Sequence, residues 1–284
     1  MDYLVLGGRG YLGSRIFDFL NTSSNNVTIG SDTFTNKESS KLKIISNYRN
    51  LNDHQLINLT NSYDLIIDAT GISGSKVLNK TIPEVLQFNT IWPIRLVNAC
   101  IKNKTRLVWF STYHCEGLNI NEKSSIRTEI YQLSKLITES SIYEIKGWNE
   151  FVSIVRLANM IGPPGNYYFG KSSLFSIDIT KNLILNSKAN VRSDPSKKFA
   201  FVPISDLLNS KVFSYPGFYT LYSKKKISLF TLSNEIRDSY DKFSGNKGKI
   251  YFDNYNGDHI SNELISKDIK CEIDLMVDYF LRNK

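Results

Sequence analysis

Apolar and polar positions at the start of the chain follow first a strand pattern and then a helix pattern. Residues 3–6 form a short apolar run that ends at a pair of glycines, and this run predicts a strand. Apolar side chains then recur at helical spacing, at Leu12, Ile16, Phe19 and Leu20. A polar connection follows, and residues 27–29 predict a second strand. The start of the chain therefore predicts a strand, a turn, a helix and another strand.

The same alternation continues through the first half of the chain. Three further apolar runs predict strands, at 65–67, 107–110 and 152–157. Two longer stretches have helical spacing, at 82–101 and 126–145. Pro93 lies inside the first of these stretches, where it is placed to kink the helix. Strands that alternate with helices favour a parallel sheet covered on both faces, so residues 1–160 predict a doubly wound α/β domain.

Beyond the last of these strands the periodicity weakens. Residues 162–165, Gly-Pro-Pro-Gly, break the chain, and aromatic residues stand among small ones after them. A smaller C-terminal lobe is predicted from residues 161–199 and 224–284. The segment near 200–223 contains a strand pattern at 218–222 and is predicted to return to the main sheet.

Composition limits the class of protein but identifies no functional site. The 284 residues are 41% hydrophobic and 22% charged, which fits a folded globular chain with one core and a smaller lobe. The net charge of +8 attracts phosphates without identifying their source, and the lysine run 224–226 is interpreted as a solvated loop. Three cysteines without CxxC spacing predict neither disulfides nor a metal site. With no leader pattern and no long apolar run, we expect a cytoplasmic protein without a membrane partner.

Glycines dominate the connection between the first strand and the first helix. Its sequence is Gly7-Gly8-Arg9-Gly10-Tyr11-Leu12-Gly13, which fits both G-x-G-x-x-G and G-x-x-G-x-x-G. In this context glycines let backbone amides approach a pyrophosphate at the positive end of a helix. A tight turn without a ligand is the alternative, but the position after an N-terminal strand favours dinucleotide binding. The cofactor contacts expected in this turn are Gly7, Arg9, Gly10, Tyr11, Leu12 and Gly13.

The end of the second predicted strand bears on which dinucleotide is bound. An acidic side chain that binds the adenosine ribose is expected there, about 20 residues after the glycines. Counting along the strand places Ser31 at that position, and Asp32 follows it. With Ser31 there, the site lacks the negative charge that would repel the 2′-phosphate of NADP. The Arg9 guanidinium could pair with that phosphate. This favours NADP, and NAD stays open.

Tyr131 and Lys135 are the strongest candidates for proton transfer. They are four residues apart and share one face of the helix predicted at 126–145. This helix follows a strand that ends at Thr112, whose hydroxyl could hold a substrate oxygen. A lysine charge lowers the pKa of a nearby phenol from about 10, which makes the tyrosine a usable acid or base for a carbonyl or an alcohol. A surface pair without a role in chemistry is the alternative.

Taken together, these features resemble the extended short-chain dehydrogenase/reductases, particularly those acting on nucleotide sugars. The likeness runs nearly end to end and includes the glycine turn, the segment 68–71 after a strand, and the Tyr131/Lys135 pair. It implies a Rossmann-type fold in which Thr112, Tyr131 and Lys135 handle the proton. It also implies an Asn89 that supports the lysine and its proton relay. Further cofactor contacts that it implies are Ser31, Asn50, Leu51, Ala69, Thr70, Gly71, Asn89 and Lys135.

The resemblance extends to the substrate side, with departures. The segment 156–163 is similar to one whose asparagine, here Asn159, approaches the substrate diphosphate, and 199–206 resembles a later stretch of the substrate lobe. Members that dehydrate the sugar usually have Asp-Glu after the catalytic threonine, whereas Tyr113 and His114 stand here. Dehydration is therefore disfavoured, and both residues are expected to face the substrate. Another departure is Glu116, which replaces the usual tyrosine before Gly117.

These observations lead to one expected function and two alternatives. We expect an NAD(P)-dependent oxidoreductase that reduces a keto group, most simply at C4, on a nucleotide-activated sugar. A 4-epimerase that retains its NAD is the first alternative. A dinucleotide- or RNA-binding protein without turnover is the second, and an intact Thr112, Tyr131 and Lys135 argue against it. The resemblance also implies a homodimer.

Overall fold

The computed structural model describes residues 1–31, 42–73, 75–116, 126–169, 174–253 and 264–283. Asp32 and Gly117, which entered the expectations above, lie outside the described residues. The chain divides into two compact units. The first unit comprises Met1–Leu157, Pro164–Lys171 and Ser210–Thr220. The second unit comprises Ala158–Pro163, Ser172–Asn209 and Leu221–Lys284.

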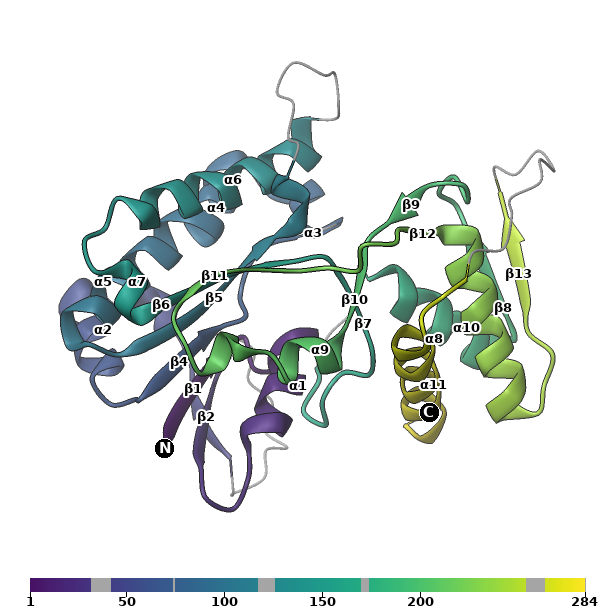
Figure 1. The fold of residues 1–284 in the computed structure, drawn as a ribbon, viewed down its shortest axis with the longest axis horizontal. Helices are drawn as coiled ribbons and strands as arrows, with labels where there is room; N and C mark the ends of the chain where they lie inside the picture. Colours follow the sequence, from purple (N-terminus) through teal and green to yellow (C-terminus); the bar gives the residue numbers. More distant parts are fainter. Residues whose placement is uncertain (32–41, 74, 117–125, 170–173, 254–263, 284) are drawn as a thin grey trace. The chain divides into compact units, whose positions relative to one another are not determined.

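A seven-stranded sheet forms the centre of the first unit, with the order β11-β6-β5-β4-β1-β2-β3 (Figure 1). The strands are β1 (Asp2–Leu6), β2 (Asn26–Gly30), β3 (Lys43–Ile45), β4 (Leu65–Asp68), β5 (Arg106–Thr112), β6 (Val152–Leu157) and β11 (Gly217–Leu221). Neighbours from β3 across to β6 pair in parallel. The predicted doubly wound α/β fold is confirmed.

The order of the strands fixes where a ligand can bind. The chain runs outward from β1 to β3 and then crosses back to β4, so the direction of winding reverses between β1 and β4. In open parallel sheets, ligands bind beyond the carboxyl ends of the strands at this reversal. The glycine turn follows β1 and the 69–71 segment follows β4, so both lie at this edge.

Helices cover the sheet on both faces (Figure 1). The helix α1 (Tyr11–Leu20) packs on one face, and the other face carries α2 (Asp53–Thr60), α4 (Ile82–Leu86), α5 (Trp92–Asn103) and α6 (Ile126–Tyr143). Shorter helical segments are η1 (Tyr48–Asn50), α3 (Ser75–Leu78), η3 (Tyr113–Cys115), α7 (Trp148–Phe151) and η4 (Lys211–Phe213). The core of this layer buries Leu6, Ile66, Leu96 and Leu107 fully, with Trp109 from β5 beside them.

The helix predicted at 82–101 is present but is not regular. A π-helical turn, η2 (Gln87–Ile91), separates α4 from α5 and comes directly before Trp92 and Pro93. Because proline has no backbone N–H, it cannot donate a hydrogen bond to the preceding turn. The expected kink at Pro93 therefore takes the form of a wider turn just before it, which is a known cause of bends in helices.

The described residues of the second unit form four helices and three strand pairs. Its helices are α8 (Phe175–Asn186), α10 (Leu229–Ser244) and α11 (Lys267–Arg282), with the shorter α9 (Ile204–Leu208). Its strands are β7 (Asn159–Ile161), β8 (Lys188–Val191), β9 (Lys198–Phe199), β10 (Phe201–Pro203), β12 (Ile227–Ser228) and β13 (Lys249–Phe252), paired as β7–β10, β9–β12 and β8–β13. The segment predicted to return to the sheet thus supplies β11 to it, whereas β10 and α9 belong to the second unit.

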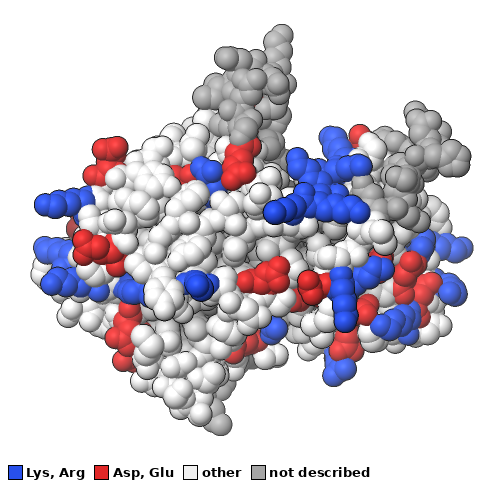
Figure 2. All heavy atoms as spheres, in the orientation of Figure 1, with Lys and Arg blue, Asp and Glu red and all other residues white. Residues whose placement is uncertain are grey.

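Charged side chains of both signs are interspersed over the surface shown in Figure 2. One gathering of basic side chains lies where Figure 1 labels β9 and β12, and the lysines at 198 and 224–226 are exposed. None of the described helices combines the length and apolarity that a membrane crossing needs. Within the described ranges, His, Cys, Asp and Glu side chains do not gather in threes as a metal site would require.

A buried ion pair ties α6 to β6. Glu139 on α6 is 1% exposed and accepts hydrogen bonds from Arg156 Nε at 3.0 Å and from Arg156 Nη2 at 2.6 Å. This fork-shaped pairing is the strong geometry for a guanidinium and a carboxylate. The Arg156 guanidinium also lies over the Phe218 ring of β11, 5.0 Å from its centroid. The pair therefore links the helix to two neighbouring strands.

We expect Glu139→Ala to lower the free energy of unfolding by roughly 2–4 kcal/mol, because it leaves the Arg156 charge without its buried partner. The measurement is chemical denaturation followed by circular dichroism. Asp278→Ala is the matched control, since Asp278 pairs with Arg282 on an exposed face of α11, and its cost should stay below about 1 kcal/mol. Equal losses of unfolding free energy in the two variants would contradict the proposed contribution of the Glu139–Arg156 pair to stability.

Candidate active site

The glycine turn after β1 is held in a conformation that only small residues allow. Gly7 has φ of +74°, and its N–H donates to the Gly30 carbonyl at 2.8 Å. A Cβ on Gly13 would lie 2.2 Å from the Gly7 carbonyl oxygen, so the first turn of α1 packs directly on this loop. Gly10 at the N-cap has no side chain that could accept from the first helical N–H groups. The start of α1 thus has no side-chain cap, and such a helix start suits an anion.

The segment after β4 lies against the glycine turn. A Cβ on Gly7 would approach the Ala69 carbonyl oxygen to 2.9 Å. Buried Asp68 fixes this segment, because its Oδ1 accepts from Thr70 N at 3.1 Å and from Thr70 Oγ1 at 2.5 Å. Gly71 follows with φ of +148°. The structure thus brings Gly7, Ala69, Thr70 and Gly71 to one place, the carboxyl edge at the winding reversal.

Residues expected beside the adenosine lie at the neighbouring strand ends. Ser31 is 5% exposed, and its N–H donates to the Ile45 carbonyl at 2.9 Å, which extends the pairing of β2 with β3. Asn50 is exposed at the end of η1, and the carbonyl of Leu51 accepts from Arg95 Nη2 at 2.6 Å. The two residues after Leu51, Asn52 and Asp53, form the start of α2.

Asn52 and Asp53 have partners at the start of α2. The Asn52 side chain caps α2 and accepts from Gln55 N at 2.9 Å. Asp53 accepts from Arg95 Nε at 2.8 Å. The carboxylate of this stretch is therefore engaged in an ion pair on the helix surface.

Arg9 projects from the glycine turn onto an aromatic ring that sequence reasoning did not identify. Its guanidinium lies over Phe169, 4.9 Å from the ring centroid, and the Phe169 N–H donates to the Arg9 carbonyl at 3.0 Å. Nearby, Gly165 N donates to the Ser14 hydroxyl of α1 at 3.0 Å. Residues 164–169 thus run along the start of α1 beside the turn. The only sequence signal for this contact was the cluster of aromatic residues after the 162–165 break.

The structure brings the expected phenol and hydroxyl together. Thr112 ends β5, is 3% exposed, and its side chain is hydrogen bonded to Tyr131 of α6. The Thr112 Oγ1 also accepts from His114 N at 3.3 Å, which holds the hydroxyl in place at the start of η3. Two side chains 19 positions apart therefore meet at the carboxyl end of a central strand.

The predicted direction of the Tyr131 pKa shift is wrong. Burial raises the pKa of Tyr131 to about 12, and the hydrogen bond with Thr112 only partly offsets this shift. The prediction rested on the Lys135 charge alone. The sequence does not show how far the phenol is removed from water, and this removal raises its pKa. At neutral pH the phenol is therefore protonated, which makes Tyr131 a hydrogen-bond and proton donor.

Lys135 is buried one turn further along α6. Its Nζ donates to the Phe110 carbonyl of β5 at 2.7 Å and lies 4.6 Å from the centroid of the Trp109 ring. Burial lowers the pKa of Lys135 to about 8, against the opposing effect of Asp68. Phe110 and Trp109 were not identified from the sequence as partners, because their spacing marks them only as strand residues.

Asn89 lies inside the π-helical turn η2 and is 1% exposed. Its side chain is hydrogen bonded to the backbone of Ile72, next to Gly71. A Cβ on Gly71 would lie 3.4 Å from Asn89 Oδ1 and 3.6 Å from Lys135 Nζ. Asn89, Gly71 and Lys135 therefore surround the same point, and the support that Asn89 gives to the lysine and its relay stays a prediction.

The residues in the first unit fit a bound dinucleotide. The glycine turn leaves no room for side chains, the N–H groups of α1 are uncapped by a side chain, and Gly71 stands beside the Lys135 ammonium. Hydroxyl and phenol groups for a substrate oxygen are at Thr112 and Tyr131, beside this segment. Such a combination can provide a pyrophosphate site and a proton donor at one sheet edge.

The loop after Thr112 contains the other substrate-facing candidates. Tyr113 and His114 form η3 and are both partly buried. Cys115 is buried, its thiol donates to the Gln132 carbonyl at 3.4 Å, and burial raises its pKa to about 11. Cys115 is thus a protonated, packed thiol. The structure places Tyr113 and His114 directly after the strand end, and their contacts with a substrate stay a prediction.

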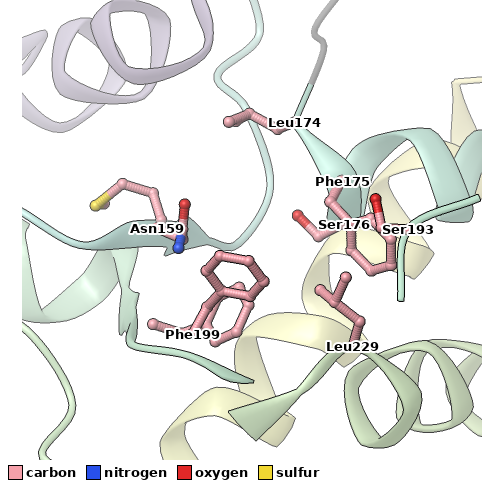
Figure 3. A pocket seen from close by; sticks show the side chains of 9 residues that line it. Asn159, Leu174, Phe175, Ser176, Ser193, Phe199 and Leu229 are labelled. Carbon is pink, nitrogen blue, oxygen red and sulfur yellow. The ribbon is translucent and has the colours of Figure 1, made fainter. Parts of the chain in front are cut away.

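Asn159 belongs to the second unit, where it lines a pocket of about 170 Å³. Its Nδ2 donates to the Ala200 carbonyl at 3.2 Å. Figure 3 shows the Asn159 amide, the Phe199 ring and the Ser176 hydroxyl grouped around the same space. The lining residues are Asn159, Met160, Leu174, Phe175, Ser176, Ser193, Phe199, Phe201 and Leu229. Most of these were invisible to sequence reasoning because they come from separate segments.

Comparison with known proteins gives one family and many similar folds. The NAD dependent epimerase/dehydratase family matches residues 3–209. No curated protein matches the chain. Similar solved structures include a UDP-N-acetylglucosamine 4-epimerase from Methanobrevibacter ruminantium M1 in complex with UDP-N-acetylmuramic acid, with 17% identity, a TM-score of 0.74, and 100% of this chain and 99% of that chain covered.

Two further structures have the same fold. MoeE5 in complex with UDP-glucose and NAD has 17% identity and a TM-score of 0.71, with 100% of this chain and 99% of that chain covered. TunA, an NAD-dependent NDP-hexosamine 5,6-dehydratase involved in tunicamycin biosynthesis, has 17% identity and a TM-score of 0.72, with 100% of this chain and 98% of that chain covered. At these identities the likeness establishes the fold.

We expect Gly13→Ala to destabilise the protein by roughly 1–3 kcal/mol, because the added Cβ collides with backbone that cannot move aside easily. The measurement is chemical denaturation. Gly10→Ala is the control in the same turn, since its Cβ would meet only the Gly7 carbonyl oxygen, at 3.1 Å. A Gly10→Ala loss as large as that of Gly13→Ala would refute the packing argument.

Stability should rise with pH through the titration of Lys135. Its pKa is about 8 in the folded protein against an ordinary value of 10.5, so between these values the unfolded chain binds more protons. From pH 7 to 9.5 this contributes about 2 kcal/mol of added stability. The difference in unfolding free energy between wild type and Lys135→Met should change by that amount over this pH range. A difference that stays constant with pH would show that burial does not lower the pKa of Lys135.

Proposed function

The chain belongs to the NAD dependent epimerase/dehydratase family, and from this premise we propose that it reduces a keto group on a nucleotide-activated sugar. The observation that carries the proposal is the hydrogen bond between Tyr131 and Thr112 beside the buried Lys135. This arrangement offers a proton donor and an orienting hydroxyl at the sheet edge where the glycine turn lies. A nicotinamide bound in the first unit would supply the hydride.

In this mechanism each side chain has a separate task. The Tyr131 phenol donates its proton to the carbonyl oxygen of the substrate, and the Thr112 hydroxyl orients that oxygen. The Lys135 ammonium, fixed by the Phe110 carbonyl at 2.7 Å, lies beside Gly71 and would bind the ribose next to the nicotinamide. Alignment of the reacting groups then contributes most of the rate, because no strong acid is required.

The proton on Tyr131 fits the donor role that reduction of a keto group needs. Since burial raises the pKa of Tyr131 to about 12, the phenol rather than the phenolate predominates at neutral pH. A phenol can protonate a developing alkoxide, whereas removing a proton from an alcohol requires the phenolate. We therefore assign Tyr131 the donor role in the reduction of a keto group, which we propose to lie at C4.

The residues after Thr112 argue against loss of water from the sugar. Elimination needs a carboxylic acid and a base near the reacting carbons, and Tyr113 and His114 occupy the two positions that follow the threonine. The neutral, buried thiol of Cys115 does not replace either group. We therefore propose that TunA-like dehydration is not the reaction of this chain.

The second unit is proposed to hold the nucleotide part of the substrate. Its pocket combines the rings of Phe175 and Phe199 with the Asn159 amide and the hydroxyls of Ser176 and Ser193. Such a lining can receive a planar base and hydrogen bond to polar groups. UDP-sugars occur in the names of several similar structures, which supports a nucleoside diphosphate sugar as the class.

NADPH is the proposed cofactor, with NADH as the comparison. The neutral Ser31 at the strand end and the Arg9 cation in the turn both favour a 2′-phosphate. The structure of MoeE5 holds NAD, however, so the two cofactors are tested side by side. Oxidation of NADH and of NADPH is followed at 340 nm with a panel of 4-keto nucleotide sugars.

A 4-epimerase is the second candidate, because the family includes epimerases. Such an enzyme returns the same hydride to the sugar and therefore keeps its NAD through each cycle. Nicotinamide absorbance that stays with the purified protein, together with sugar interconversion without added cofactor, would favour epimerisation. Stoichiometric oxidation of added NADPH or NADH favours the reductase.

We expect Tyr131→Phe to reduce turnover by at least 100-fold, since general acid catalysis contributes about 10²–10⁴. Its NADPH affinity should stay within about twofold of wild type, because the phenol oxygen is not part of the proposed dinucleotide site. Turnover is measured by absorbance and affinity by fluorescence titration.

The control for this variant is Tyr143→Phe on the same helix. Tyr143 is 43% exposed and packs with Trp148 and Phe218, away from Thr112. Its activity should match wild type. Wild-type turnover in Tyr131→Phe would remove Tyr131 from the mechanism.

A further inference from the structure

Residues 165–169, which we call the strap, lie along helix α1 in the first unit. The N–H of Gly165 donates to the Ser14 hydroxyl at 3.0 Å, and the N–H of Asn166 donates to Asp18 Oδ2 at 2.7 Å. Ser14 and Asp18 are four residues apart, so they share one face of the helix. The strap therefore follows that face over a turn of α1.

The strap also packs closely against this helix. A Cβ on Gly165 would collide with the Ser14 carbonyl, so the two backbones are in direct contact. The Tyr167 ring meets the Phe17 ring edge to face, with 5.3 Å between the centroids. Phe17 is only 1% exposed, so this contact anchors the strap in the core of the first unit. The helix that begins at the glycine turn thus fixes the position of the strap.

Phe169, the last residue of the strap, contacts Arg9 of the glycine turn in two ways. Its N–H donates to the Arg9 carbonyl at 3.0 Å, and the Arg9 guanidinium lies over its ring, 4.9 Å from the centroid. The ring is 56% exposed, so it gains less from burial than a core phenylalanine does, and the contact with a cation contributes to its placement. One residue therefore holds both the backbone and the side chain of Arg9.

The glycine turn is also bound to the end of β2. Gly7 N and Gly8 N both donate to the Gly30 carbonyl, at 2.8 Å and 3.2 Å. Ser31 follows Gly30, at the strand end where the adenosine ribose of a bound dinucleotide would lie. Arg9 follows Gly8 directly, so the backbone that carries its side chain is tied to this strand end.

A guanidinium suits the 2′-phosphate that distinguishes NADP from NAD, because its planar fork of N–H groups matches phosphate geometry. The Phe169 ring attracts the charge and takes no conventional hydrogen bond from it, so this contact does not compete with a phosphate. An arginine loses side-chain freedom when it binds a phosphate. The ring contact removes part of that loss in advance, which strengthens binding.

We propose that Phe169 is a specificity-determining residue that favours NADPH over NADH by presenting Arg9 to the 2′-phosphate. The proposal rests on the proposed function, in which the first unit binds a dinucleotide with NADPH as cofactor. Phe169 acts through Arg9 and is therefore a positioning residue. A loss of its ring should weaken binding of the dinucleotide that carries the phosphate, whereas general damage to the glycine turn would weaken binding of both.

Phe169→Ala tests the proposal, and Phe169→Tyr is the conservative variant that keeps the ring. Phe243→Ala is the matched control, because Phe243 on α10 is 42% exposed and has its own cation, Lys242 Nζ, 4.6 Å from the ring centroid. Phe169→Ala is also made in an Arg9→Ala background, which forms a double-mutant cycle. The probes are NADPH and NADH, titrated by fluorescence at one fixed salt concentration.

We expect Phe169→Ala to raise the Kd of NADPH about fivefold and that of NADH by less than twofold. Phe169→Tyr and Phe243→Ala should each keep both Kd values within about twofold of wild type. In the Arg9→Ala background, Phe169→Ala should change the Kd of NADPH by less than twofold, because the cation is already absent. Should Phe169→Ala fail to fold, Phe169→Leu keeps an apolar side chain without the ring and carries the same expectation.

Three results would overturn the proposal while NADPH stays the cofactor. They are an unchanged Kd for NADPH in Phe169→Ala, equal increases for both dinucleotides, and a full fivefold increase in the Arg9→Ala background. A wild-type protein that binds NADH as tightly as NADPH also overturns it, although reduction with NADH remains possible. If wild type binds neither dinucleotide, the proposed function fails and the proposal fails with it. The failure of each is therefore a separate result.

Discussion

The buried ammonium of Lys135 is the constraint on which the arrangement of the first unit depends. A positive charge removed from water must find partners, and here they are the Phe110 carbonyl and the Trp109 ring, both from β5. These contacts fix where α6 crosses the end of the strand. Because Tyr131 lies one turn before Lys135, the same contacts bring its phenol to Thr112.

The same helix is held at successive turns by different kinds of interaction. Tyr131 and Ser134 are hydrogen bonded to neighbours at the cofactor edge, Lys135 to β5, and Glu139 to Arg156 of β6. Polar groups buried this deeply have a high cost if left unpaired. Their complete pairing therefore selects one placement of the helix, which an apolar face alone would not do.

The sequence predicted well whatever depends on local pattern. The alternation of strands and helices, the glycine turn and the Tyr131/Lys135 spacing are each visible within a short window, and the fold they predict is confirmed. The predicted direction of the Tyr131 pKa shift was wrong, because the pKa depends on burial by segments that are distant in the sequence. The partners of Asn89 depend on Ile72 and Ser134, 17 and 45 positions away. No spacing rule relates such residues, and the pocket around Asn159 was hidden for the same reason.

The π-helical turn at Gln87–Ile91 has a consequence for the evolution of the chain. Such a turn amounts to one extra residue inserted in an otherwise regular helix. Deleting one residue there would restore the regular helix and rotate the Asn89 position by about 100°. A chain that lost this residue would therefore no longer direct the Asn89 side chain at Ile72 and Ser134.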